Sequence, residues 1–177
     1  MATEHTTIDT ELGGLTLVAD GGNLTGLYFP HHWYMPARAT FGPRVDAADS
    51  ALFARVATQL PEYLAGDRTT FDLPTRTHGT PFEEQVWALL REIPYGSTTT
   101  YGALARELAD QPLAKDVGRA VGRNPLSVIV PCHRVIGADG KLTGYAGGLR
   151  RKQFLLEREH AIRQAEPASA ASALTLF

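Results

Sequence analysis

SVIVPCHRV, residues 127–135, contains the only cysteine of this 177-residue chain. The residues before Pro131 are mostly β-branched and apolar, which predicts a short buried strand. Pro131 cannot donate to a strand ladder, so it should end the strand and place Cys132 on a turn at the edge of the core. The thiolate is the reactive form of cysteine, and a neighbouring imidazole lowers the thiol pKa. Residue type alone favours an inert buried cysteine, but His133 and Arg134 beside it favour a reactive one.

Further motifs lie on both sides of this stretch. Asn124 and Pro125 precede it, GYAGGL at residues 144–149 follows it, and Lys152 and Glu159 come later. Together with PCHRV, this spacing resembles that of the O6-alkylguanine-DNA alkyltransferases, the proteins that remove alkyl groups from damaged guanine. The resemblance is strong from about residue 80 to Glu159 and covers the earlier part of the chain only in general layout.

A chain of 177 residues can bury one sizeable core, or two small domains that share an interface. Its apolar content of 44% and charged content of 20% are typical of a soluble globular protein. No apolar run approaches the ~20 residues of a membrane span, and the first residues carry no secretion signal. The lone cysteine excludes an intramolecular disulfide and suits a reducing compartment. We therefore expect a cytoplasmic protein without membrane contact.

Neither a metal nor a cofactor is expected. A single cysteine argues against a cysteine-based zinc site, and His31 and His32 are interpreted as part of a solvated loop rather than as a metal pair. The net charge of −2 excludes a general polyanion binder. Any contact with nucleic acid must therefore come from a local basic face.

Residues 1–79 are predicted to form an α/β support domain, to which we assign no chemistry. Strands are expected at residues 6–9, 15–19, 24–29 and 69–73, with turns at 13–14 and 20–23. Apolar residues at every fourth position predict a helix that ends near Gly66, with a kink or an early break at Pro61. The apolar stripe consists of Leu52, Val56, Leu60 and Leu64.

Residues 80–164 are predicted to form a mostly helical second domain. Thr80 and Glu83 supply an N-cap and a capping-box glutamate, and Pro81 suits the first turn of a helix that stops at residues 94–96.

Two short helices follow, at residues 101–108 and at about 113–123, with a turn at 111–112 between them. This is the arrangement of a helix-turn-helix. A last helix is expected from about 150 to 163, and residues 165–177 are interpreted as a flexible tail with an apolar latch at its end.

The second helix of the pair carries a basic stripe. Lys115, Arg119 and Arg123 lie four residues apart, whereas Gly118 and Gly122 cost about 1 kcal/mol each relative to alanine and should serve the close approach of another backbone. Such a helix fits a groove wall and its phosphates; a solvated charged face is the alternative.

The resemblance adds a fold and a mode of binding. It implies an α/β (α+β) protein in which the first domain is ribonuclease-H-like and the second is a winged-helix relative. It also implies a monomer whose basic helix enters the minor groove of double-stranded DNA containing O6-alkylguanine. Lys115 stands where the family has an arginine that replaces the extruded base. Lysine lacks the planar guanidinium, so base flipping should be less well supported.

The resemblance further implies DNA repair by direct transfer of an alkyl group, such as methyl, from O6 of guanine to Cys132, with O4 of thymine left open as a second substrate. His133 would carry off the thiol proton through a water, and Glu159 would orient the imidazole. Tyr101 would donate to N3 of the flipped base; a core tyrosine is the alternative.

The substrate-binding residues are expected around the thiol. A backbone N–H of Ala146 or of its neighbours Tyr145 and Gly147 would meet the departing O6. The backbone around Val135 would read the guanine edge, and Asn124 would tie the preceding helix to the thiol turn.

The product determines the number of turnovers. An alkyl thioether does not hydrolyse and no second cysteine is available, so Cys132 should be consumed in one event. The expected activity is that of a single-use methyltransferase. Three alternatives stay open: a non-turnover binder of alkylated DNA, a cysteine hydrolase that uses Cys132, His133 and Glu159 for acyl transfer, and a transcriptional regulator.

Overall fold

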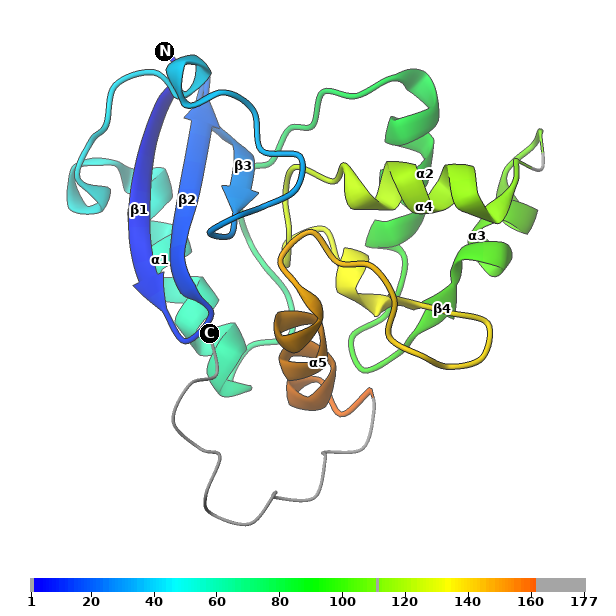
Figure 1. Ribbon diagram of the computed structural model, residues 1–177. Helices are drawn as coiled ribbons and strands as arrows, with labels where there is room; N and C mark the ends of the chain where they lie inside the picture. Colours follow the sequence, from blue (N-terminus) through cyan, green and yellow to red (C-terminus); the bar gives the residue numbers. More distant parts are fainter. Residues whose placement is uncertain (1, 111, 162–177) are drawn as a thin grey trace.

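The computed structural model describes residues 2–110 and 112–161 and has two lobes (Figure 1). A three-stranded sheet with one helix beside it forms the first lobe, and the second lobe is mainly helical. This is the mixed α/β architecture that the sequence predicts. The flexible tail expected at residues 165–177 lies outside the described residues. Within the described part of the chain, no helix is both long and apolar enough to cross a membrane.

The sheet is an antiparallel meander in the order β1 (Glu4–Thr10), β2 (Gly13–Asp20) and β3 (Asn23–Tyr28), which confirms the first three predicted strands. The turn expected at residues 13–14 is wrong, because Gly13 already pairs with Thr10 as the first residue of β2. The Thr10 hydroxyl closes the turn earlier: it accepts from the Leu12 N–H and donates to the Gly13 carbonyl, each over 3.0 Å.

Helix α1 (Ala51–Ala65) packs beside β1 and runs through Pro61, so the early break predicted there is wrong. A proline removes one helical hydrogen bond, and the burial of Leu60 and Leu64 on either side of it outweighs that loss. The helix ends at Gly66 as predicted, where φ is 88° and favours glycine. Two 3-10 helices, η1 (Arg38–Phe41) and η2 (Ala47–Asp49), come before α1.

The strand expected at residues 69–73 does not form. The Asp72 N–H donates to Oε1 of Gln59 over 2.8 Å, and Nε2 of Gln59 donates to the Asp72 carbonyl over 3.0 Å. A side-chain amide thus takes the two backbone groups that a strand ladder would use. Thr75 reaches the sheet through an isolated bridge to Leu24.

The second lobe begins with α2 (Pro81–Arg91), and its predicted capping box is confirmed. The Glu83 N–H donates to the Thr80 hydroxyl over 3.2 Å, and the Thr80 N–H donates to the Glu83 carboxylate over 2.9 Å. The Trp87 indole N–H donates to the Ala120 carbonyl over 2.8 Å, which ties α2 to the basic helix.

Helices α3 (Tyr101–Glu107) and α4 (Ala114–Gly122) pack against each other and confirm the predicted helix pair. A parallel pair of short strands, β4 (Thr99–Thr100) and β5 (Val135–Ile136), precedes α3 and follows the thiol turn. The sequence did not predict these strands, because two residues are too short for a periodic pattern.

Helix α5 (Leu149–Arg158) ends earlier than predicted. The backbone becomes left-handed at His160, where φ is 58°. The His160 N–H donates to the Glu157 carbonyl over 3.1 Å, and the Ala161 N–H donates to the Leu156 carbonyl over 2.9 Å. These are the two bonds of a Schellman motif, which satisfies the last carbonyls and stops the helix.

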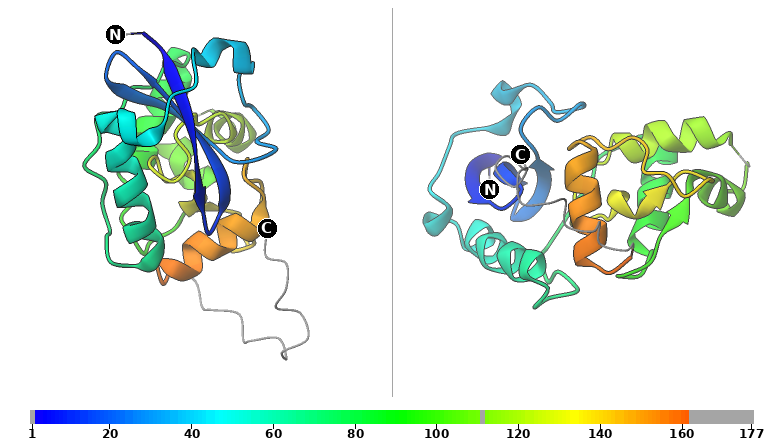
Figure 2. Two further views of the ribbon diagram at one scale, coloured as in Figure 1. Left: turned by 90° about the vertical axis from the view of Figure 1, so that its left-hand side faces the viewer. Right: turned by 60° about the horizontal axis from the view of Figure 1, so that its bottom comes forward.

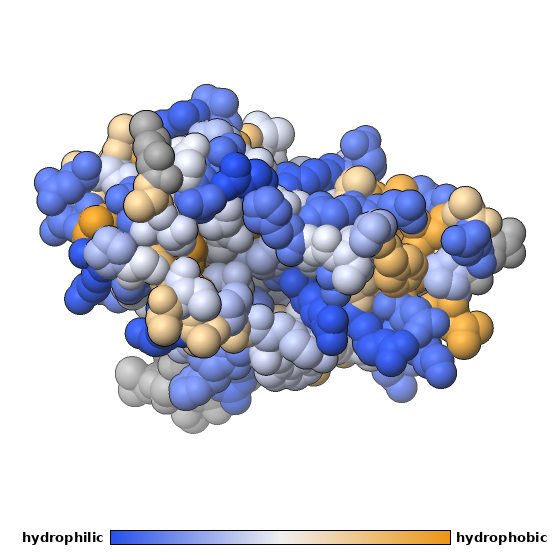
Figure 3. Space-filling model, turned by 90° about the horizontal axis from the view of Figure 1, so that it is seen from above, coloured by the Kyte–Doolittle hydropathy of each residue, from blue (hydrophilic) through white to orange (hydrophobic). Residues whose placement is uncertain are grey.

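The two lobes share one hydrophobic core. In the right-hand view of Figure 2, α5 lies between the sheet lobe and the helical lobe. The Leu27 N–H of β3 donates to the Pro125 carbonyl over 2.8 Å, and Nε of Arg151 in α5 donates to the Leu12 carbonyl over 2.7 Å. These bonds fix residues of one lobe against the other. The face in Figure 3 is mostly hydrophilic, with its hydrophobic residues gathered mainly over the helical lobe.

Candidate active site at the boundary of the two lobes

The turn that carries Cys132 is built differently from the prediction. Residues 127–130 form a tight turn and not a strand, with Val128 at a left-handed φ of 72°. The buried Asn124 amide holds this turn: its Nδ2 donates to the Val130 carbonyl over 2.9 Å, and its Oδ1 accepts from the Leu126 N–H over 3.0 Å. Because Asn124 and local bonds satisfy the backbone, no neighbouring strand is needed. Pro131 then precedes a 3-10 turn, η3 (Cys132–Arg134).

Cys132 is 4% exposed and lines a cavity of about 290 Å³. Burial raises the pKa of the thiol, and Asn124, Lys152 and Ser127 oppose part of that rise. The sequence predicts a thiol pKa lowered by the neighbouring imidazole, and this prediction is wrong. The resting thiol is therefore protonated at neutral pH, because loss of water around the sulfur outweighs the nearby polar groups.

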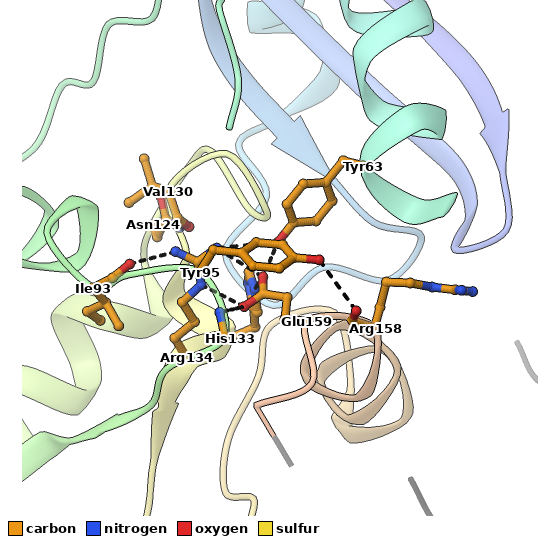
Figure 4. Close-up of polar contacts among 10 residues, drawn as sticks. Tyr63, Ile93, Tyr95, Asn124, Val130, His133, Arg134, Arg158 and Glu159 are labelled. Carbon is orange, nitrogen blue, oxygen red and sulfur yellow. Dashed lines mark hydrogen bonds and ion pairs between the residues drawn. The ribbon is translucent and has the colours of Figure 1, made fainter. Parts of the chain in front are cut away.

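A buried carboxylate lies behind the thiol turn (Figure 4). His133 and Glu159 are fully buried side chains, and Nε2 of His133 lies 2.6 Å from Oε1 of Glu159. Nε of Arg134 donates to Oε2 of Glu159 over 2.8 Å, and the Tyr63 hydroxyl donates to Oε1. We refer to Tyr63, His133, Arg134 and Glu159 as the buried polar network.

Electrostatics assign the protonation states in this network. Burial alone would raise the pKa of Glu159, but the hydrogen bonds from His133, Arg134 and Tyr63 outweigh it and hold the pKa at about 2. Burial lowers the pKa of His133, although Glu159 opposes this. The pair is thus a carboxylate and a neutral imidazole that donates its Nε2–H. Nδ1 of His133 has no hydrogen-bond partner among the described residues and carries the free lone pair.

Tyr63 was not predicted as a site residue, because the sequence of the first domain indicates no chemistry. It lies on α1 and is 1% exposed. Its position between Leu60 and Leu64 is that of an ordinary core residue, so no local pattern could have indicated a contact with Glu159 in the other lobe.

Lys152 is a fully buried lysine behind the cavity wall. Its Nζ donates to the carbonyls of Val135, Thr143 and Gly144, with a distance of 2.8 Å to Thr143. Burial lowers its pKa to about 8, and the neighbouring Cys132 opposes this. Lys152 therefore joins α5, β5 and the glycine-rich loop. It also engages the carbonyl of Val135, a residue expected to read guanine.

The glycine-rich loop forms part of the wall of the cavity that contains the thiol. Tyr145 is 3% exposed, packs its ring 5.7 Å from that of Phe29 and, like Ala146, lines the cavity. A Cβ at Gly147 would lie 2.3 Å from the Phe29 ring, so only glycine fits. Gly147 itself does not line the cavity and accepts a hydrogen bond from Arg151.

Tyr101 begins α3 and lines the same cavity. Its hydroxyl donates to the Thr143 carbonyl over 3.1 Å. Burial raises its pKa, so the phenol keeps its proton at neutral pH. The ring lies 3.6 Å from the position of a Cβ at Gly118. A Cβ at that distance would make an ordinary van der Waals contact, and the approach of another backbone to the glycines of α4 stays a prediction.

The basic stripe of α4 divides between two surfaces. Lys115 and Arg119 line the cavity that contains Cys132, and Arg119 also pairs with Asp116. Arg123 does not line this cavity; its Nη1 lies 3.2 Å from Oε1 of Glu83.

The interpretation of His31 and His32 as part of a solvated loop is wrong for His32. This side chain is 6% exposed, and burial lowers its pKa to about 4. Nδ1 of His32 accepts from the Phe29 N–H over 3.4 Å. The described residues contain no group of three His, Cys, Asp or Glu side chains that could hold a metal ion.

Comparison with known proteins agrees with this architecture. A family model described as "6-O-methylguanine DNA methyltransferase, ribonuclease-like domain" matches residues 4–77. A second, described as "6-O-methylguanine DNA methyltransferase, DNA binding domain", matches residues 81–161. The two matches define the class of protein, a ribonuclease-like domain followed by a DNA-binding domain. The chain belongs to the 6-O-methylguanine DNA methyltransferase family, which confirms the resemblance seen in the sequence.

Relatives and solved structures support this assignment over nearly the full chain. The methylated-DNA--protein-cysteine methyltransferase of Mycobacterium tuberculosis is 43% identical over 173 residues, which cover 98% of each chain. That of Mycolicibacterium paratuberculosis is 44% identical over 176 residues, again 98% of each. The crystal structure of Mycobacterium tuberculosis OGT in complex with DNA is similar with a TM-score of 0.80 at 43% identity, covering 89% of this chain and 93% of that chain.

Proposed function

We propose that this protein repairs DNA by transferring an alkyl group from O6 of guanine to Sγ of Cys132. The observation that carries the proposal is the lone cysteine at a cavity, next to a neutral histidine held by a buried carboxylate, in a chain of this family. One S–C bond forms and one C–O6 bond breaks. The thiol proton leaves through His133, and a proton from solvent ends on the released guanine.

His133 is proposed as the base. Its free Nδ1 lone pair takes the proton of Cys132 through a water molecule, and the Glu159 carboxylate stabilises the imidazolium that results. Because Glu159 has a pKa of about 2, it stays charged at every working pH. The thiolate then forms only when a substrate is in place, which agrees with a protonated resting thiol.

The cavity wall is proposed to bind the base. Tyr101 keeps its proton and would donate its hydrogen bond to N3 of guanine in place of the Thr143 carbonyl, to which it donates in this structure. The backbone N–H of Ala146 or its neighbours Tyr145 and Gly147 meets the departing O6. Asn124 supports this site by holding the thiol turn.

The backbone around Val135 is proposed to contact the edge of the guanine base. The Val135 carbonyl bonds to Lys152 in this structure, so that carbonyl would have to accept a second donor to contact the base. A carbonyl oxygen has two lone pairs and can do so.

Helix α4 is proposed as the DNA-binding element, entering the minor groove of the duplex. Lys115 is exposed at the cavity and would fill the place of the flipped base, while Gly118 and Arg119 border the same opening. Arg123 would meet a phosphate farther along the helix. We further propose that the protein acts as a monomer in the cytoplasm, and that residues 1–79 support a working domain at residues 80–164.

The test is the intact mass of the protein after incubation with excess O6-methylguanine duplex. We expect a gain of one methyl group, located on the Cys132 peptide, and no gain for Cys132→Ser. Methyl release beyond one equivalent per protein would contradict single use and favour a hydrolase. Binding without any gain of mass would identify a non-turnover binder.

A further inference from the structure

Two large aromatic side chains at the cavity have no role in the site described above. Trp33 and Tyr34 are 64% and 49% exposed, yet both line the cavity that contains Cys132. They come from the loop after β3, in the first lobe. Aromatic rings dominate binding energetics where a site leaves them open to a ligand. The first lobe therefore contributes a surface to the thiol cavity.

The loop that carries these rings is anchored by His32, the residue before Trp33. The buried His32 ring stacks on Phe29 with 6.1 Å between ring centroids and meets Tyr28 edge-on at 5.2 Å. The His32 N–H also donates to the Phe29 carbonyl over 3.2 Å. Because His32 is fixed, the backbone position of the next residue, Trp33, is also defined.

Tyr34 packs against the C-terminal end of helix α4. The Arg123 guanidinium lies 5.5 Å from the centre of its ring, a cation–π arrangement. The ring also lies 3.6 Å from the position of a Cβ at Gly122. Tyr34 thus packs across the boundary of the lobes, and Trp33 beside it is the more exposed of the pair.

We propose that Trp33, backed by Tyr34, forms the wall of the cavity that contacts the substituent on O6 and favours large planar groups over methyl. The inference rests on the proposed transfer to Cys132. In such a displacement the sulfur, the reacting carbon and O6 lie nearly in line, so the remaining atoms of the substituent project sideways against a wall. Tyr101 and the Tyr145 loop are assigned to the base.

The other walls offer less contact to a planar substituent. Helix α4 lines the cavity with two glycines, the short side chain of Val121 and the flexible side chains of Lys115 and Arg119, none of which is aromatic. The Trp33 indole gives the largest aromatic surface that the base does not use. Stacking on it stabilises a benzyl group and has no counterpart for a methyl group.

The experiment uses free O6-methylguanine and O6-benzylguanine bases without DNA, so that base flipping does not enter. Transfer rates to Cys132 are measured by intact mass for the wild type, Trp33→Ala, Trp33→Phe and Leu113→Ala. Leu113 is a matched control, because it is 62% exposed and does not line the cavity. We expect Trp33→Ala to lower the benzyl-to-methyl rate ratio about tenfold, Trp33→Phe to keep most of it, and Leu113→Ala to keep all of it.

An unchanged ratio in Trp33→Ala would overturn the proposal, as would an equal loss of both rates in a variant that keeps its melting temperature. Wild-type protein that takes up neither group, from the free bases or from duplex DNA, would instead refute the transfer itself. The two failures are therefore distinguishable.

Discussion

The two sides of Cys132 are built on opposite principles. Behind it, the buried polar network of Tyr63, His133, Arg134 and Glu159 is charged and held by short hydrogen bonds from both lobes. In front of it, the cavity mouth is exposed, with Lys115, Arg119, Trp33 and Tyr34 facing solvent.

This difference separates chemistry from recognition. A buried network can set the direction of proton transfer for any substrate, since it does not touch the substrate. Side chains at the exposed cavity mouth can be substituted at little cost in stability, because substitutions of exposed residues usually change the free energy of unfolding very little. Substitutions behind the thiol should therefore slow transfer from all substrates and destabilise the fold, whereas substitutions in front should affect particular substrates.

Glu159→Gln should produce the largest effect. Transfer should slow roughly 10²-fold or more, because the imidazolium loses its carboxylate. The free energy of unfolding should fall by about 3–5 kcal/mol, because Arg134 becomes an unpaired buried charge. Rates come from quenched transfer assays and stability from denaturant melts.

Tyr63→Phe is the matched control for that variant. It removes one hydrogen bond to Glu159 and leaves both charges paired, so it should cost only about 1–3 kcal/mol and little rate. DNA binding should change little in either variant. A normal transfer rate in a folded Glu159→Gln would remove this residue from the site.

Acid should weaken the network in a predictable window. The pKa of Glu159 is lowered from 4.5 to about 2, so its contribution of about 3 kcal/mol is complete above pH 4.5 and is lost as the pH falls toward 2. The stability difference between wild type and Glu159→Gln should therefore shrink over that range. A difference that stays constant from pH 7 to pH 2 would mean that Glu159 is not held as a carboxylate.

Lys115→Ala should have an intermediate effect that depends on the substrate. Repair of duplex DNA should slow far more than transfer from free O6-methylguanine nucleoside, where no stack is opened. Lys115→Arg should hold or improve the duplex rate, because a guanidinium stacks and hydrogen-bonds where an ammonium does not. If Lys115→Ala slows neither substrate, another residue replaces the flipped base.

Arg119→Ala and Arg123→Ala should have the smallest effect. Each should weaken binding to damaged and undamaged DNA alike and flatten the salt dependence by about one unit of slope. Titrations of labelled duplex at several salt concentrations measure this. A loss confined to damaged DNA would place the side chain at the lesion and not at a phosphate.

The sequence predicted the elements of this protein better than the contacts between them. The capping box at Thr80 and the helix pair follow from local patterns, and the thiol motif was recognised from its spacing. The turn at residues 127–130 could not be predicted, because its apolar residues have the pattern of a buried strand. The turn depends on Asn124, whose side chain bonds to the Val130 carbonyl and the Leu126 N–H.

The contacts across the lobes were also beyond local patterns. Tyr63 and Glu159 are far apart in the chain and meet only in the shared core. His32 was interpreted as solvated because a loop histidine usually is, and its burial depends on the rings of Tyr28 and Phe29. The raised thiol pKa at Cys132 likewise follows from burial, which a neighbouring histidine in the sequence does not reveal.

The division at Cys132 is tested most directly by one ratio, the transfer rate on O6-methylguanine duplex divided by that on the free nucleoside, measured side by side for Glu159→Gln and Lys115→Ala. The ratio should stay at the wild-type value in Glu159→Gln, because proton transfer serves both substrates. It should fall sharply in Lys115→Ala. A ratio that falls in Glu159→Gln and stays unchanged in Lys115→Ala would contradict the separation of chemistry behind the thiol from recognition in front of it.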